Sequence, residues 1–90
     1  MTRTNYPVID MREVGARIKR LRLANHLRVT DISDEMGFET PQAVYKWQRG
    51  DCLPEIVNLI ILSRMFGTTV EAIVVGEEVE DSPPEYEKSA

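Results

Sequence analysis

Cysteine, histidine and long apolar runs are all scarce in this sequence of 90 residues. The one cysteine, Cys52, cannot form an internal disulfide, and with no second cysteine or clustered histidine a metal site is not expected. The one histidine, His26, has no nucleophile partner, which argues against catalysis. Apolar runs such as residues 59–62 are too short to span a membrane, and no export signal is evident. We therefore expect a cytoplasmic protein without cofactor, metal or enzymatic activity.

A net positive charge, which is common in nucleic-acid-binding proteins, is also absent, because the formal net charge is −4. The charge is uneven along the chain, however. Residues 1–54 contain nine Lys and Arg against seven Asp and Glu, whereas residues 55–90 contain two against eight, which gives balances of +2 and −6. Binding to phosphate depends on a local basic face rather than on the total charge. The composition therefore allows DNA binding, with weak non-specific affinity.

Five segments carry apolar residues at the three- and four-residue spacing of an α-helix, and none alternates as a strand does. The residues before them have apolar side chains around Pro7 and are interpreted as an arm. Residues 77–90 are acidic and contain a Pro-Pro pair, a composition typical of a disordered tail. The sequence therefore predicts one all-α domain of five helices, residues 10–76, between an arm, residues 1–9, and that tail.

The first two predicted helices have recognisable ends. Asp10 begins the first helix and forms an Asp version of the capping box with Glu13, and this helix ends near Asn25. The second helix covers about residues 29–36 and ends at Gly37, which can adopt a positive backbone angle. The residues expected to point inward are Val14, Ile18, Leu21, Ile32 and Met36.

The third predicted helix follows the second after a brief turn. Thr40 caps it, Pro41 occupies its first position, and Gly50 ends it. Val44 and Trp47 are its inward pair, since aromatic residues at helical spacing usually pack in the core. Two short helices joined in this way form a helix-turn-helix. In that motif one helix crosses the DNA backbone, and the N-terminal residues of the other reach base edges.

The fourth predicted helix begins at Pro54 and ends at Gly67, and Thr69 caps a short fifth helix. Because the fourth helix is apolar nearly all round, we expect it to be covered on two sides. Its core face is predicted to consist of Ile56, Leu59, Ile60, Ser63 and Phe66.

A second apolar stripe runs beside that core face, formed by Val57, Ile61 and Met65 at four-residue spacing. A two-fold dimer is the favoured explanation, because closed dimers are the commonest assemblies and would present two third helices about 34 Å apart, one turn of DNA. The alternative is that the arm covers the stripe through Tyr6, Val8 and Ile9.

Five stretches of the sequence match a known pattern: GARIKRLR at 15–22, MGF at 36–38, QAVYKWQRG at 42–50, LPEI at 53–56 and LSRMFG at 62–67. Through these stretches the chain resembles the Cro/CI-type (XRE) helix-turn-helix family, which has the lambda repressor-like five-helix fold. The resemblance covers roughly residues 14–75.

The resemblance implies that the third helix reads bases. Gln42 matches a base-reading position, and a glutamine can bond two atoms of adenine at once. Lys46, one turn later on the same face, matches another such position and suits guanine or a phosphate. Ala43 is placed to touch a thymine methyl group.

The resemblance also implies phosphate contacts from Arg28, Tyr45 and Arg49. Arg28 lies at the start of the second helix, Tyr45 on the flank of the third, and Arg49 before the glycine that ends it. Arg17 is expected to brace the third helix rather than to touch DNA.

Four residues depart from the family pattern. Val29 stands where the family usually has glutamine, which removes one expected phosphate contact, and Ser33 replaces the usual alanine where the two helices approach closely. The turn contains one extra residue around Glu39, and Glu39 and Asp51 put negative charge near the expected DNA face.

Together these patterns predict a sequence-specific regulator that binds double-stranded DNA and acts as a repressor. The alternative is a protein-interaction module, such as an antitoxin or scaffold, that keeps the fold and uses the apolar stripe or the tail. A small enzyme is disfavoured, because the sequence lacks paired carboxylates, a nucleophile with its base, and a metal-ligand constellation.

Overall fold

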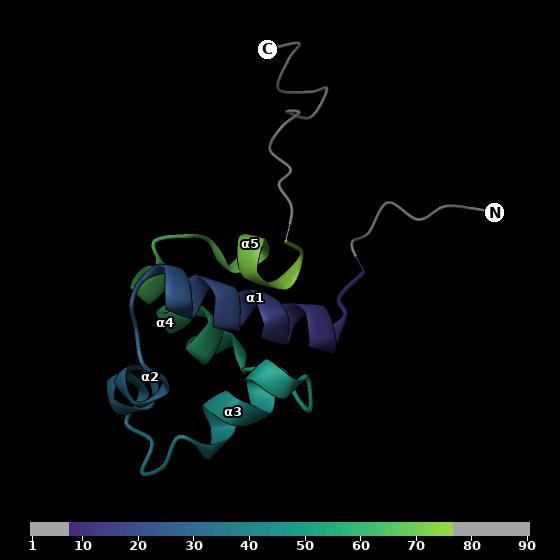
Figure 1. Cartoon of the computed structure of the whole chain (residues 1–90). Coiled ribbons are helices and arrows are strands. Elements are labelled where there is room, and N and C mark those ends of the chain that lie inside the picture. The colour runs from purple at the N-terminus through teal and green to yellow at the C-terminus, as the bar shows by residue number, and fades with distance from the viewer. Residues whose placement is uncertain (1–7, 77–90) are drawn as a thin grey trace, which may run out of the picture.

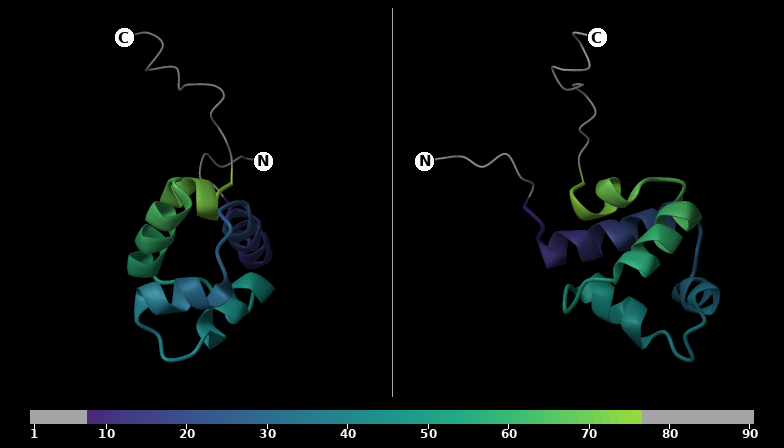
Figure 2. Two further views of the ribbon diagram at one scale, coloured as in Figure 1. Left: turned by 60° about the vertical axis from the view of Figure 1, so that its left-hand side comes forward. Right: turned by 180° about the vertical axis from the view of Figure 1, so that it is seen from behind.

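The computed structural model describes residues 8–76, which form helices and loops without any strand. Figure 1 shows α1 in the middle of the fold, with α5 against one side and α3 against the other. In the left view of Figure 2, α1 and α4 lie on opposite sides, α5 joins them at one end, and α2 and α3 close the other. Within residues 8–76 the predicted all-α fold with five helices is thus confirmed: α1 (Met11–Ala24), α2 (Val29–Met36), α3 (Gln42–Arg49), α4 (Ile56–Phe66) and α5 (Val70–Val74).

Local signals in the sequence account for most helix ends. The Asp10 carboxylate accepts hydrogen bonds from the backbone N–H groups of Arg12, at 2.9 Å, and Glu13, at 3.4 Å, and so caps α1. Gly37 and Gly50 end α2 and α3 with φ of 77° and 82°.

Most of the predicted arm and the whole predicted tail lie outside the described residues, so both remain predictions.

The start of α3 differs from the prediction by one residue. The helix begins at Gln42, and Pro41 is its N-cap with a non-helical ψ of 11°. The hydroxyl of Thr40 lies 3.5 Å from the backbone nitrogen of Gln42, at the outer limit for a hydrogen bond. Pro41 therefore belongs to the turn that precedes α3.

The core lies where the inner faces of all five helices meet. The predicted inward residues of α1, α2 and α3 are buried or pack against this core, and Thr69 caps α5 by accepting a hydrogen bond from Ala72 at 3.0 Å. The buried apolar residues are Val14, Ile18, Val29, Ile32, Val44, Trp47, Leu59, Leu62, Phe66 and Ile73.

The predicted core face of α4 is wrong at two positions. Ile56 and Ile60 are 61% and 42% exposed, whereas Leu62, which the prediction left out, is fully buried. The buried face consists of positions 59, 62, 63 and 66, the spacing of one helix face. Because α4 is apolar nearly all round, its sequence offered two faces, and packing against the other helices selected one.

The second stripe of α4 is only partly as predicted. Val57 is 61% exposed, but Ile61 and Met65 are half-buried, and Met65 packs against the core. In the described part of the arm, Val8 and Ile9 are exposed, while Tyr6 lies outside the described residues, so covering of the stripe by the arm stays a prediction. The exposed apolar surface of α4 therefore lies nearer the N-terminal end of the helix than the predicted stripe does.

Candidate nucleic-acid interface

α3 has one apolar side that fixes it and one polar side that faces outward. Val44 and Trp47 are buried, and the ring of Phe38 packs edge-on against the Trp47 ring with centroids 6.0 Å apart. The outward side carries four exposed side chains that sequence reasoning assigned to DNA contacts or to their flanks: Gln42, Tyr45, Lys46 and Arg49.

A close approach between α1 and α3 sets the position of α3. A Cβ atom added at Gly15 would collide with the backbone carbonyl oxygen of Trp47 and would lie 2.6 Å from that of Gln48. Only glycine therefore allows the two helices to pack at this separation. The sequence contained this signal within the GARIKRLR stretch, but its packing role is visible only in the structure.

Arg22 ties three segments together, a role that sequence reasoning missed. Its Nε donates to the side-chain oxygen of Gln48 on α3 at 2.9 Å, and its Nη1 donates to the backbone oxygen of Leu27 at 2.9 Å. Both acceptors are neutral, so the bonds orient the guanidinium without cancelling its charge. Nothing in the basic run of α1 distinguished Arg22 from its exposed neighbours.

Arg17 braces α5, so the prediction that it braces the third helix is wrong. Its guanidinium donates to the backbone oxygens of Ile73, at 2.8 Å, and Val74, at 3.0 Å. These carbonyls end a five-residue helix and have no later helical N–H to bond. The cationic side chain thus caps α5 and holds it against α1.

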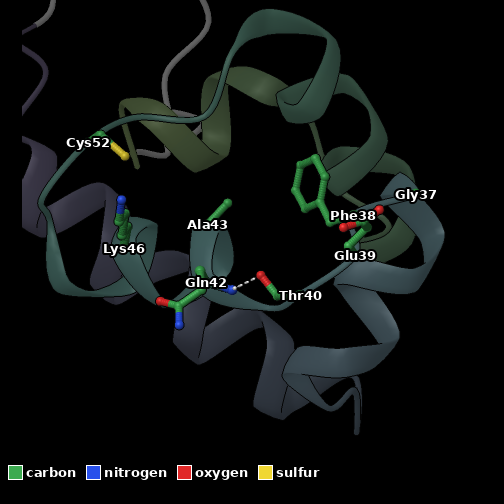
Figure 3. A pocket seen from close by; sticks show the side chains of 8 residues that line it. All are labelled: Gly37, Phe38, Glu39, Thr40, Gln42, Ala43, Lys46 and Cys52. Atoms are coloured by element: carbon green, nitrogen blue, oxygen red, sulfur yellow. Dashed lines mark hydrogen bonds between the residues drawn. The ribbon is translucent and has the colours of Figure 1, made fainter.

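A hollow of about 670 Å³ lies beside the first turns of α3. Figure 3 shows Ala43 on its wall, Lys46 extended toward Cys52, and Gln42 beside Thr40 at its edge. The three predicted base-reading residues therefore lie together on one surface. Ala43 is half-buried and packs partly against the core, so its methyl group is less accessible than the side chains of Gln42 and Lys46.

Two of the three predicted phosphate-binding residues are paired with carboxylates. Arg28 forms a two-bond ion pair with Asp31, whose N···O distances are 2.8 and 3.3 Å. Arg49 donates to Asp51 at 2.9 Å. Tyr45 is exposed on the flank of α3, where sequence reasoning placed it. The positive charge that Arg28 and Arg49 provide beside α3 is consequently smaller than the two arginines alone would give, because each carboxylate offsets a neighbouring positive charge.

The Arg28–Asp31 pair predicts a local pH dependence. The guanidinium of Arg28 lowers the pKa of Asp31 below its ordinary 3.8, and the backbone N–H of Arg28 adds to the effect. A carboxylate with a lowered pKa stabilises the fold above its ordinary pKa, and this contribution is lost as the pH falls through the lowered value. An NMR titration of the Asp31 carboxyl carbon should therefore have a midpoint below 3.8. In Arg28→Ala the midpoint should rise, and an unchanged midpoint would show that the pair does not form in solution.

Three residues that depart from the expected helix-turn-helix pattern, Ser33, Val29 and Glu39, differ in their burial. Ser33 is buried, and its hydroxyl donates to the backbone oxygen of Thr30 at 3.2 Å, so this polar group has a hydrogen-bond partner inside the fold. Val29 is buried at the start of α2 and offers no phosphate contact. Glu39 is exposed in the turn and lines the hollow.

Residues 8–76 contain no group of three or more His, Cys, Asp or Glu side chains able to hold a metal ion. In the same residues, no helix has the length and apolar character needed to cross a membrane.

Comparisons with known proteins match structure rather than sequence. No family model matches the chain, and neither does any curated protein. The DNA-binding domain of BldD superposes with a TM-score of 0.59 at 18% identity, over 72% of this chain and 93% of that one. The S. venezulae BldD DNA-binding domain matches with the same TM-score and identity, over 72% of this chain and 96% of its own length. The resemblance to the Cro/CI-type family stays a prediction, and the chain has the helical helix-turn-helix fold that these two domains share.

Proposed function

We propose that this protein binds double-stranded DNA sequence-specifically by placing α3 in the major groove. The observation that carries the proposal is the outward side of α3, where Gln42 and Lys46 are exposed one turn apart on a helix locked by Gly15 and Arg22. Base reading requires such rigid presentation, because a bidentate contact tolerates little error in position. The shared fold with DNA-binding domains supports the proposal.

Each residue on this surface has a defined proposed role. The Gln42 amide can donate to adenine N7 and accept from its N6 amino group once its side chain turns appropriately, and Lys46 suits guanine O6 and N7 or a phosphate. Ala43 contributes an apolar contact to a thymine methyl group. Arg28, Tyr45 and Arg49 lie on the flanks as phosphate contacts. Bound across a promoter, the protein would act as a cytoplasmic repressor by blocking polymerase.

The experiment that tests this function is a titration with mixed genomic DNA and with sequences selected from it, at two salt concentrations. Specific binding should persist at physiological salt with a shallow salt slope, because few phosphates are neutralised. The absence of any binding at physiological salt would reject DNA as the ligand.

Two substitutions test the base-reading residues. Gln42→Ala and Lys46→Ala should each weaken binding to the preferred site by about 1–3 kcal/mol and relax base preference at one position, since each removes a groove contact. The matched control is Arg20→Ala, which removes one positive charge from the exposed side of α1. If both α3 variants keep the wild-type base preference, the assignment is wrong even where DNA binding survives.

The second candidate is a protein-interaction module, and the ion pairs Arg28–Asp31 and Arg49–Asp51 favour it, because they offset charge where phosphate would bind. Asp31→Asn and Asp51→Asn separate the two functions. Asparagine can still accept the backbone N–H that Asp31 binds, so α2 should keep its cap.

If the flanking arginines meet DNA, each of these variants should bind more tightly at low salt. Each should also steepen the plot of log K against log salt by about 0.9, because one more phosphate is neutralised. Fluorescence anisotropy at several salt concentrations measures both quantities. Unchanged affinity and slope in both variants would remove Arg28 and Arg49 from the DNA interface. The absence of DNA binding by the wild type and by both variants would favour the interaction module.

A further inference from the structure

The hollow beside α3 has a negative charge at one end, which the base contacts proposed above leave unused. Figure 3 shows Glu39 at the end formed by the turn, Lys46 at the opposite end, and Gln42 between them. All three side chains are exposed. The hollow therefore presents, in this order, a hydrogen-bond acceptor, an amide that accepts and donates, and a donor.

The turn that carries Glu39 is anchored on both sides of this residue. The backbone N–H of Phe38 donates to the backbone oxygen of Ser33 at 2.9 Å, and the Phe38 ring packs against Trp47. Pro41 follows two positions after Glu39, and its ring fixes its φ. The turn therefore holds the Glu39 backbone at a defined place beside α3, which the reading of a base edge requires.

The carboxylate of Glu39 has no structural task within residues 8–76. No cation of these residues pairs with it, whereas arginines engage Asp31 and Asp51. It does not cap α3 either, because the side-chain oxygen nearest to the first backbone N–H of that helix belongs to Thr40. The Glu39 oxygens are therefore available to accept hydrogen bonds from a ligand that enters the hollow.

We propose that Glu39 reads a cytosine beside the bases contacted by Gln42 and Lys46, an inference that rests on the DNA-binding function proposed above. A carboxylate only accepts hydrogen bonds, and cytosine is the base whose major-groove edge offers a donor, its N4 amino group, and no acceptor. The acceptors of adenine, guanine and thymine would repel the carboxylate. Glu39 thus contributes selectivity rather than affinity, because its charge also repels the phosphates of every sequence.

The test compares the motifs that full-length variants enrich from a pool of random duplexes. In the wild-type motif, a cytosine should flank the position affected by Gln42→Ala, on the side away from the position affected by Lys46→Ala. Glu39→Ala should reduce the preference for that cytosine by about tenfold, since it removes one base contact. Glu39→Gln should admit adenine there, because an amide can donate to N7 and accept from the N6 amino group.

Glu35→Gln is the matched control, because it removes the same charge from an exposed position of α2 outside the hollow. It should leave the motif unchanged, and circular dichroism checks that every variant folds. If Glu39→Ala binds all sequences more tightly but enriches the wild-type motif, Glu39 only repels phosphates. That result overturns the inference and leaves base reading by α3 intact. A wild-type chain that enriches no motif rejects the proposed function, and the inference with it.

Discussion

Replacing Gly15 by alanine is expected to lower the free energy of unfolding by about 3 kcal/mol, through overpacking between α1 and α3. The added methyl group would collide with the backbone oxygens of Trp47 and Gln48, which cannot rotate away as a side chain can. The gain in helix propensity from alanine, about 1 kcal/mol, offsets only part of this cost. Urea unfolding monitored by circular dichroism measures the change, and the melting temperature should fall by roughly 15 °C.

Gly37→Ala is the control for this prediction. Gly37 also has a defined structural role, but an added Cβ atom would have no neighbour within 4 Å. Its only cost is the positive φ of 77°, roughly 1–2 kcal/mol for a residue with a side chain. If Gly15→Ala were as stable as wild type, α1 and α3 would not meet as closely as the structure shows. The position proposed for the base-reading helix would then be wrong as well.

Leu62→Ala is expected to destabilise the protein by about 2–5 kcal/mol, because removing a fully buried leucine side chain leaves a cavity in a packed core. Ile60→Ala, on the same helix, should cost less than about 1 kcal/mol, because that side chain is 42% exposed. The pair is measured by urea unfolding at low protein concentration, so that self-association does not contribute. Equal losses in both variants would mean that α4 is rotated relative to the structure.

Leu62 and Ile60 also show that the sequence alone did not predict which face of α4 is buried. Position 60 fits an apolar stripe as well as position 62 does, so periodicity alone could not choose between them. The choice depends on which neighbouring helices α4 meets, and that information is distributed over the chain. Helix ends were easier, because Asp10, Gly37 and Gly50 act through their own backbone or nearest turn.

In the candidate site, too, the sequence predicts local features but not contacts between distant segments. The outward direction of Gln42 and Lys46 followed from the inward pair Val44 and Trp47 on the same short helix, and it agrees with their exposure. The partners of arginine side chains could not be read from the sequence. The backbone oxygens that Arg17 binds belong to Ile73 and Val74, which follow it in the sequence by 56 and 57 positions. Only the fold brings the end of α5 beside α1.

The ion pairs on the flanks change the balance between functions. A protein with Arg28 and Arg49 free would attract DNA of any sequence, whereas these arginines are paired with Asp31 and Asp51. Weak non-specific attraction leaves a larger share of the affinity to base contacts. The observed pairing is therefore compatible with a selective regulator, provided that the outward side of α3 makes those contacts.

Selection of bound duplexes from a random oligonucleotide pool tests the central claim most directly. If α3 reads the major groove, the wild-type chain should enrich a short motif, and the chain with Gln42→Ala should lose the preference at one position of that motif. A pool that stays random after repeated rounds with the folded wild-type protein would contradict DNA reading by α3.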